Sequence, residues 1–194
     1  MSTSEKPRYH HGDLRAALLG AAMDLLEEDD GGLSLRAVAR RAGVSATAPY
    51  RHFADKDELE SELAAQGFAD LGHRLAAAAA QPATPEDLAQ LAVNYVRFAL
   101  DRPALFRLMF GTPCTTPEDA RAVAAAELGA FVLTHVSQAF PQADAEALAT
   151  ASWSLVHGLA FLHLDGKLPS GNAEEVEARV TAAITAILAL RGTA

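Results

Sequence analysis

Positively charged side chains gather in one short stretch of an otherwise acidic chain. Residues 34–56 hold five basic side chains against one acid, Asp55, a net charge of +4, whereas the 194-residue chain carries −9. The five are Arg36, Arg40, Arg41, Arg51 and Lys56. Lys and Arg at this density neutralise phosphate groups, a non-covalent chemistry typical of nucleic-acid binding. The stretch therefore predicts a small basic head, and the acidic remainder is repelled by phosphate, which orients the approach.

The same stretch has the pattern of two helices joined by a tight turn. A helical pattern follows Ser34 and ends at Gly43, and a short helix over 46–52 follows Ser45. Gly43 can take the positive φ that the turn requires, and the Ser45 hydroxyl can cap the free amides of the short helix. Together these features predict a helix-turn-helix. The alternative is an alanine-rich helix pair that simply belongs to the core.

The short helix begins with small side chains, which allow a backbone to lie deep in a major groove. Thr47 can hydrogen-bond a base there, and the methyl groups of Ala46 and Ala48 can touch thymine. Base reading then depends on Thr47, Arg36 and DNA shape, while the other polar side chains reach phosphates. The predicted DNA contacts are Ser34, Arg36, Ser45, Ala46, Thr47, Ala48, Tyr50, Arg51, His52 and Lys56.

Residues 31–59 resemble the signature of the tetracycline-repressor (TetR) family of transcriptional regulators. The resemblance is carried by Ala42-Gly-Val-Ser45, Tyr50-Arg-His-Phe53 and Asp55-Lys-Asp-Glu-Leu59. It implies that the short helix is the recognition helix, that Tyr50, His52 and Lys56 hold the DNA backbone, and that Phe53 anchors the turn into the next helix.

Two departures from the family pattern qualify the resemblance. Ala46 stands where many members have glycine or a polar base-reading residue, and Pro49 replaces a usual Leu or Ile. Pro49 falls in the first turn of its helix, where a missing amide costs least. Upstream, Tyr9-His-His-Gly-Asp-Leu-Arg15 is similar to a subgroup of the family. That segment is either an arm along the DNA or a frayed leader with Asp13 capping the first helix.

Two later segments resemble the Trp-His-Gly type of TetR C-terminal domain. They are Trp153-Ser-Leu-Val-His-Gly158 and Leu108-Met-Phe-Gly111. The resemblance implies a homodimer formed by the last two helices, which would present two recognition helices about one turn of DNA apart. The apolar faces of those helices are equally typical of a core within one chain.

We expect a pocket for an unidentified small-molecule effector among the middle helices. Its candidate lining residues are Phe98, Phe106, Met109, Phe110, Phe131, His135, Trp153 and His157. Each of these residues also fits a plain core. His135, His157 and His163 lack the HxxxH spacing or Cys/His cluster of a metal site, so we expect buried, hydrogen-bonded histidines and neither metal nor cofactor.

Alanine and leucine at helical spacing predict an all-α fold of about nine helices. We expect an N-terminal helix-turn-helix domain over 1–60 and a helical ligand-binding and dimerisation domain over 61–194. Two helices should start at Thr84-Pro-Glu-Asp and Thr116-Pro-Glu-Asp, with threonine as the cap. Eight of these helices are placed, over 13–28, 35–42, 46–52, 55–80, 84–102, 116–140, 144–164 and 173–191.

Composition narrows the class of protein. A single cysteine, Cys114, favours a reducing compartment, and we find neither an apolar leader nor a stretch approaching 20 uncharged apolar residues, so we expect a cytoplasmic protein without membrane contact. The sequence has no phosphate loop, nucleophile elbow or dinucleotide turn, which argues against an enzyme. The prediction is a DNA-binding regulator, a repressor released from a palindromic operator by an effector. The alternative is a constitutive or architectural DNA-binding dimer.

Overall fold

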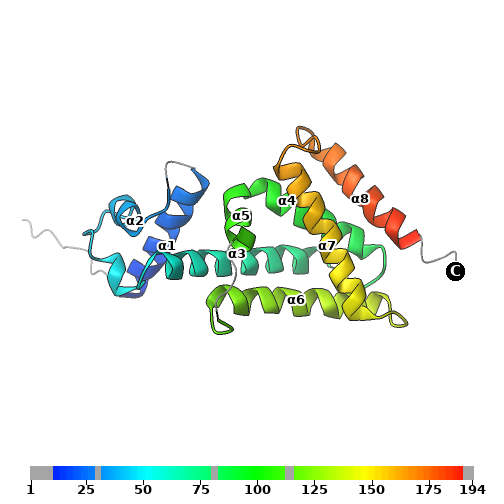
Figure 1. Ribbon diagram of the computed structural model, residues 1–194, viewed down its shortest axis with the longest axis horizontal. Helices are drawn as coiled ribbons and strands as arrows, with labels where there is room; N and C mark the ends of the chain where they lie inside the picture. The colour runs from blue at the N-terminus through cyan, green and yellow to red at the C-terminus, as the bar shows by residue number, and fades with distance from the viewer. Residues whose placement is uncertain (1–10, 29–31, 80–82, 112–115, 190–194) are drawn as a thin grey trace, which may run out of the picture. The chain divides into compact units, whose positions relative to one another are not determined.

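The computed structural model describes residues 11–28, 32–79, 83–111 and 116–189, which form helices and turns (Figure 1). Within these ranges there are eight α-helices, one 3-10 helix and no strand, as the composition predicts. The chain divides into two compact units, Met1–Leu63 and Ala64–Ala194. Predictions for the arm at Tyr9 and for Cys114 lie outside the described residues.

The first unit holds α1 (His11–Glu27), α2 (Leu35–Arg41), η1 (Pro49–Arg51) and the start of α3 (Lys56–Ala78). Its core is almost fully closed to solvent and consists of Leu18, Ala22, Val38, Phe53, Leu59 and Leu63. The Arg15 guanidinium lies 5.2 Å from the centre of the Phe53 ring and pairs with Glu62 at 2.7 Å. Phe53 is therefore buried beneath α1, as expected of the residue that anchors the turn into α3.

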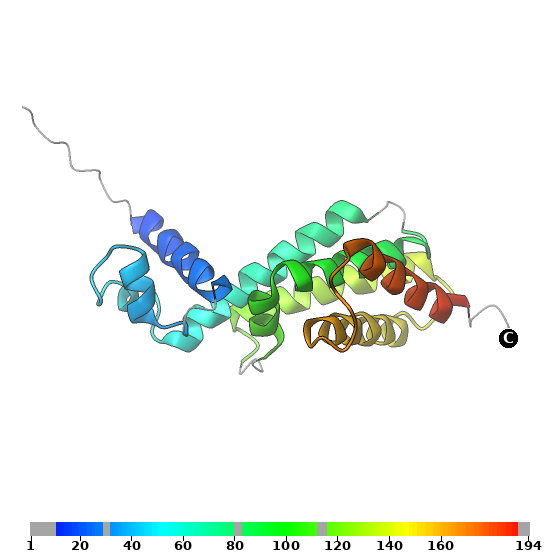
Figure 2. The ribbon, with the colours of Figure 1, turned by 90° about the horizontal axis from the view of Figure 1, so that it is seen from above.

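The second unit contains the rest of α3 and five further helices. These are α4 (Asp87–Asp101), α5 (Pro103–Gly111), α6 (Ala120–Ala139), α7 (Ala145–Leu164) and α8 (Ala173–Ala189). Helix α4 is strongly amphipathic and packs mainly against α8 and α7, which lie beside it in Figures 1 and 2. The core around it includes Leu71, Val96, Ala99, Leu105, Phe106 and Val180.

The two Thr-Pro-Glu-Asp segments start their helices later than predicted. Thr84 does not cap α4; its amide and hydroxyl donate to the Asp87 carboxylate at 2.7 and 2.9 Å, and the Asp87 amide donates to the Thr84 carbonyl. At α6 the cap is Asp119, which accepts from the Arg121 amide at 2.8 Å. In both segments the proline forms a turn before the helix, and the aspartate side chain organises the start.

Helices α6 and α7 are each 20 residues long, with mean hydropathies of 1.2 and 1.3, and by length and composition alone either could cross a membrane. The prediction that no stretch approaches this limit was therefore too strict. The feature is weak support for a membrane span, because core helices of soluble proteins meet the same test. It does show that both helices carry more apolar surface than this unit buries, since few of their residues are buried.

Candidate DNA-binding surface and regulatory cavity

The turn after α2 has the hydrogen bonds of a Schellman motif. The Ser34 hydroxyl caps the helix by accepting from the Ala37 amide at 3.2 Å, as predicted. At the other end Gly43 has φ of +69°, the Val44 amide donates to the Ala39 carbonyl, and the Gly43 amide donates to the Arg40 carbonyl. Glycine is needed at this position because an L side chain disfavours this backbone conformation.

Residues 46–52, the segment predicted to be the recognition helix and called the recognition segment below, are more tightly wound than predicted. We expected an α-helix over 46–52, but the structure has a turn followed by the 3-10 helix Pro49–Arg51. Pro49 has no amide to donate to the Ser45 carbonyl, so that carbonyl accepts from the Ala48 amide instead. The Ser45 hydroxyl lies 3.3 Å from the Thr47 hydroxyl, which replaces the cap we expected.

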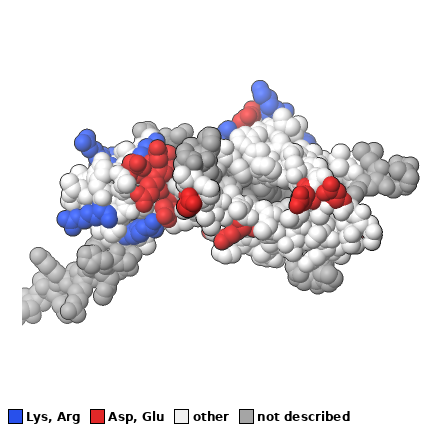
Figure 3. Space-filling model, turned by 60° about the horizontal axis from the view of Figure 1, so that its bottom comes forward, with Lys and Arg blue, Asp and Glu red and all other residues white. Residues whose placement is uncertain are grey.

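The residues expected to contact DNA lie at the surface of the first unit. Eight are exposed, and Ala48 and His52 are half-buried. Tyr50 leaves 52% of its surface to solvent, which is high for an aromatic side chain, whereas Pro49 and Phe53 are buried. On the face shown in Figure 3, Lys and Arg side chains project from the first unit beside a group of acids, while the visible face of the second unit is mostly uncharged.

Two of the five basic side chains already form ion pairs. Arg41 binds the Glu28 carboxylate with both terminal nitrogens, and this hydrogen bonding lowers the pKa of Glu28. Lys56 lies 3.0 Å from Glu60 on the same helix. Such an exposed pair contributes only about 0.3–0.5 kcal/mol, so phosphate can displace it. Arg36, Arg40 and Arg51 form no ion pair within the described part of the chain.

A reciprocal capping box fixes the start of α3 next to Lys56. The Asp55 carboxylate accepts from the Glu58 amide at 2.9 Å, and the Glu58 carboxylate accepts from the Ala54 amide at 2.6 Å. The two bonds form a capping box in which Ala54 is the reciprocal donor. It holds the chain that follows the recognition segment in one geometry.

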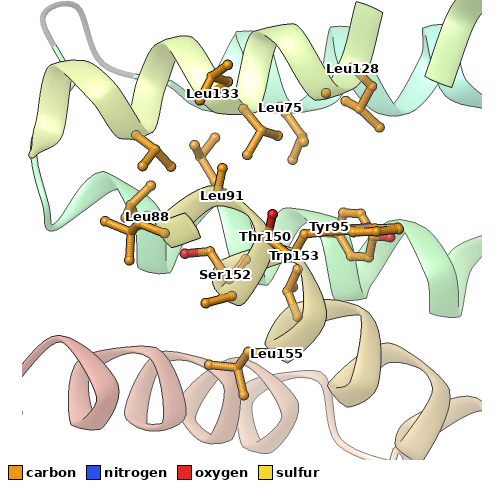
Figure 4. Close-up of a pocket in the computed structure, with 18 of the residues that line it drawn as sticks. Leu75, Leu88, Leu91, Tyr95, Leu128, Leu133, Thr150, Ser152, Trp153 and Leu155 are labelled. Atoms are coloured by element: carbon orange, nitrogen blue, oxygen red, sulfur yellow. The ribbon is translucent and has the colours of Figure 1, made fainter. Parts of the chain in front are cut away.

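The second unit contains a cavity of about 650 Å³ with mainly apolar walls (Figure 4). Leu75 of α3 and Leu128 and Leu133 of α6 lie on one side, and Leu88, Leu91 and Tyr95 of α4 lie across from them. Helix α7 contributes Thr150, Ser152, Trp153 and Leu155. The walls also include residues of α5 and α8, so six helices surround one volume suited to a small molecule.

Three of the eight residues predicted to line a pocket do line this cavity: Met109, Phe110 and Trp153. The other five do not. Phe98 and Phe106 are buried in the core, and the Phe131 ring lies 4.0 Å from the ring of His135, which is itself buried. His157 contacts Phe106, Phe110 and Phe161 behind the cavity wall.

Most of the wall consists of aliphatic residues that sequence reasoning did not select. Leu75, Leu88, Leu91 and Leu128 have no local signal that distinguishes a cavity wall from a packed core. Tyr95, which also lines the cavity, was not among the predicted residues. The one feature of the sequence that could have singled out Tyr95 is its hydroxyl, because a buried phenol requires a polar partner.

The Tyr95 hydroxyl has two partners on α7. It lies 2.9 Å from Nδ1 of His157, and it forms a hydrogen bond with Trp153. Burial raises the pKa of Tyr95, and the hydrogen bond with Trp153 lowers it by a smaller amount. Burial lowers the pKa of His157, so its imidazole is neutral near pH 7 and can accept the phenolic hydrogen. Trp153 and His157, one helical turn apart, therefore tie α7 to α4.

The histidines have the hydrogen-bonded roles expected of them. His135 Nδ1 lies 2.9 Å from the Phe131 carbonyl, and His163 Nδ1 lies 3.0 Å from the Ser170 hydroxyl. Among the residues that the structure describes, no group of three or more His, Cys, Asp or Glu side chains could hold a metal ion.

A capped helix-turn-helix with an exposed basic face, followed by a helical unit, defines the class of DNA-binding regulators. Comparison with known families is more specific. Residues 18–63 match the family described as bacterial regulatory proteins, tetR family, and residues 88–187 match the tetracyclin repressor-like C-terminal domain. The chain belongs to the TetR family of transcriptional regulators, whose members bind DNA and are not enzymes.

Solved structures share the fold along nearly the whole chain. A protein of unknown function from Rhodococcus sp. RHA1 is 33% identical, with a TM-score of 0.77 over 92% of this chain and 97% of that one. A TetR/AcrR-family transcriptional regulator from Thermobifida fusca YX-ER1 is 21% identical, with a TM-score of 0.67 over 89% of this chain and 96% of that one. A tetR-family regulatory protein from Rhodococcus RHA1 is 20% identical, with a TM-score of 0.64 over 88% and 95%. The resemblance to the Trp-His-Gly subgroup stays a prediction.

Proposed function

We propose that this regulator is a homodimeric, cytoplasmic repressor that leaves a palindromic operator when an apolar small molecule fills the cavity of its second unit. The observation that carries the proposal is the cavity itself. This pocket of about 650 Å³ has mainly apolar walls formed by six helices, as small-molecule sites have. A volume of this size matches a ligand of tens of atoms.

The walls favour a mostly hydrocarbon effector with few polar groups. Leucine, valine and isoleucine side chains from α3, α4, α6, α7 and α8 make up about half of the lining residues. The hydroxyls of Thr150 and Ser152 offer polar contacts, and Arg121, only 4% exposed, and Glu146 add one charge of each sign. A multiply charged or sugar-like ligand would leave its polar groups without partners against these walls.

Release requires that the effector bind one arrangement of the protein better than another. Helix α3 is continuous from Lys56, beside the recognition segment, to Leu75 in the cavity wall. A ligand that moves the wall therefore moves the helix that carries the DNA-binding turn. In a dimer this changes the spacing of two recognition segments, which must fit half-sites about one helical turn apart.

Selection of bound duplexes from a random DNA pool tests the proposal first. We expect a palindromic motif with half-sites about 10 base pairs apart. The selected duplex is then titrated with a panel of apolar compounds, and release by one of them is the expected result. A palindrome that no compound releases would favour the constitutive DNA-binding dimer, and absence of any motif at low salt would contradict operator binding altogether.

Single substitutions separate backbone contacts from base contacts. Tyr50→Ala and Lys56→Ala should weaken binding to every sequence and make binding less dependent on salt, because each removes a phosphate contact. Thr47→Ala should relax the sequence preference at one position of each half-site. Lys167→Ala removes an exposed lysine from the second unit and serves as the matched control. Operator affinity unchanged in the three test variants would contradict the assigned DNA-binding surface.

A further inference from the structure

One buried charge lies in the wall of the cavity in the second unit. Arg121, in the first turn of α6, lines the cavity and is only 4% exposed. Glu146, the other charged residue in the wall, is exposed. An arginine keeps its positive charge at every physiological pH, and burying a charge is costly unless an opposite charge or hydrogen bonds offset the cost. Arg121 is therefore the one buried charge among the described residues that line the cavity.

The Arg121 guanidinium can hydrogen-bond a ligand in addition to its own chain. A guanidinium has five N–H donors. The side chain takes part in another interaction within the chain, and its buried Nε makes no hydrogen bond to the described residues. Asp119, the adjacent acid, caps α6 by accepting from the Arg121 amide. A carboxylate binds a guanidinium through two parallel hydrogen bonds, and Nε with a terminal nitrogen offers one edge for such a pair.

The cavity is long in the direction of α6. This helix contributes a stripe of lining residues from Arg121, in its first turn, to Val136. At a rise of 1.5 Å per residue the stripe extends over about 22 Å, whereas a compact volume of 650 Å³ would be only about 9 Å across. The space is therefore narrow relative to its length, which suits an extended ligand better than a compact one.

The two ends of the cavity differ in chemistry. Figure 4 shows Tyr95 across the cavity from Leu128. Leu88 lies farther along, on the side of Leu133. Leu128 is closer than Leu133 to Arg121 along α6, so Tyr95 lies toward the Arg121 end. Four aromatic residues line the cavity and form one cluster around Phe110: Phe68, Tyr95, Phe110 and Trp153. The cation and the aromatic cluster thus share one end, and leucine side chains form the other.

We propose that the effector is an elongated organic monocarboxylate, whose acid group pairs with Arg121 and whose hydrocarbon chain extends along α6 toward Leu88. The inference rests on the proposed effector site and narrows its ligand from apolar compounds in general to those with one acid group. A carboxylate offsets the cost of burying the Arg121 charge, which a neutral hydrocarbon cannot do. A second acid group farther along the chain would lie against apolar walls, where no buried cation offsets its charge.

Three ligands test the charge and the length: dodecanoate, dodecan-1-ol and octanoate, each below the concentration at which it forms micelles. Trp153 is the only tryptophan of the chain and lines the cavity, so its fluorescence reports occupancy. The wild type should bind dodecanoate more tightly than dodecan-1-ol, because an apolar cavity without a cation would prefer the alcohol. Dodecanoate should also bind more tightly than octanoate, by about fourfold for each additional methylene group buried.

Substitution of Arg121 separates its charge from its packing. Arg121→Met removes the guanidinium and keeps an apolar side chain; it should weaken dodecanoate binding by about 10- to 150-fold, the range for hydrogen bonds to a charged group. Binding of dodecan-1-ol should change little. Arg121→Lys keeps the charge without the planar fork, so its dodecanoate affinity should lie between those of the wild type and Arg121→Met.

Arg74→Met is the matched control. It makes the same change of charge at an arginine that pairs with Asp101 and lies outside the cavity, so it should bind both ligands like the wild type. Circular dichroism checks that each variant is folded. If Arg121→Met is not folded, Arg121→Lys and the two ligands on the wild type provide the test.

Two results would overturn the inference: a wild type that binds dodecan-1-ol at least as tightly as dodecanoate, or a folded Arg121→Met variant that keeps the wild-type preference for the acid. Equal affinity for octanoate and dodecanoate would contradict the elongated site. Operator release by the wild type is scored separately. If neutral apolar compounds release the operator and dodecanoate does not, the proposed function stands and only the acid-binding site fails. If no compound binds the wild type, the effector site itself is refuted, and this inference with it.

Discussion

Gly67 in α3 should resist replacement by alanine because of its close packing. A methyl group placed there would lie 2.7 Å from Sδ and 2.9 Å from Cγ of Met109, and 3.1 Å from Cδ1 of Leu105. Both neighbours are buried, so neither can turn into solvent. Gly72, in the same helix, would place its methyl 4.0 Å from the Leu128 side chain, an ordinary contact. The two glycines therefore share a backbone context and differ in packing.

The expected effects have opposite signs. Replacing glycine by alanine inside a helix stabilises the fold by about 1 kcal/mol. Forcing a methyl group into a packed interior costs about 1–3 kcal/mol. Gly72→Ala should thus stabilise by about 1 kcal/mol, and Gly67→Ala should destabilise by about 1 kcal/mol. The difference of about 2 kcal/mol is the packing cost at Met109 and Leu105.

Thermal unfolding at one fixed protein concentration measures this difference, since dimerisation makes stability concentration-dependent. For a chain of this size about 2 kcal/mol corresponds to roughly 4–8 °C between the variants. A double variant, Gly67→Ala with Met109→Ala, should recover much of the penalty that alanine at Gly67 incurs in the wild-type background. If Gly67→Ala stabilises as much as Gly72→Ala, the predicted contact with Met109 is wrong.

Three other perturbations follow from single contacts. Gly43→Ala places a methyl group on a residue with φ of +69°, so the free energy of unfolding should fall by about 1–2 kcal/mol and operator binding should weaken. An unchanged free energy of unfolding would contradict the turn geometry. Asp55→Ala removes the cap of α3 and should cost about 1 kcal/mol in urea unfolding, whereas no change would mean that the cap contributes nothing. Burial lowers the pKa of His157 and His163, so below about pH 6.5 the unfolded chain binds more protons and melting temperature should fall with pH. His157→Gln should reduce that fall, and an equal fall in the variant would exclude His157 as a contributor.

The helix boundaries of the DNA-binding unit were largely predictable because its caps and turns depend on residues that are close together in the sequence. Ser34 caps α2 through an amide three residues away, and Asp55 does the same for α3. Gly43 ends α2 through its own backbone freedom. Each interaction spans five residues or fewer, so residue types and spacing were enough. The recognition segment differs from the prediction because Pro49 has no amide hydrogen to donate to the Ser45 carbonyl. The segment therefore forms the shorter-range hydrogen bonds of a 3-10 helix.

The helix starts at Thr84 and Thr116 were misplaced by a few residues for a related reason. The pattern Thr-Pro-Glu-Asp offers two side chains that can cap, and the sequence did not decide between them. In the structure the aspartate of each segment takes the hydrogen bonds, at Asp87 and Asp119. Competing local interactions of similar energy are therefore the limit of boundary prediction.

By itself the sequence determined the helical class, the helix-turn-helix with its basic face and the family, because caps, turns and charge are properties of neighbouring residues. Only the tertiary structure decided which apolar side chains are core and which face a cavity. Leu105 and Leu91 look alike in the sequence, yet Leu105 is fully buried and absent from the wall while Leu91 lines it. The difference arises because the side chains of six helices leave one volume unfilled. The residue spacing within one helix carries no information about how the other five helices pack against it.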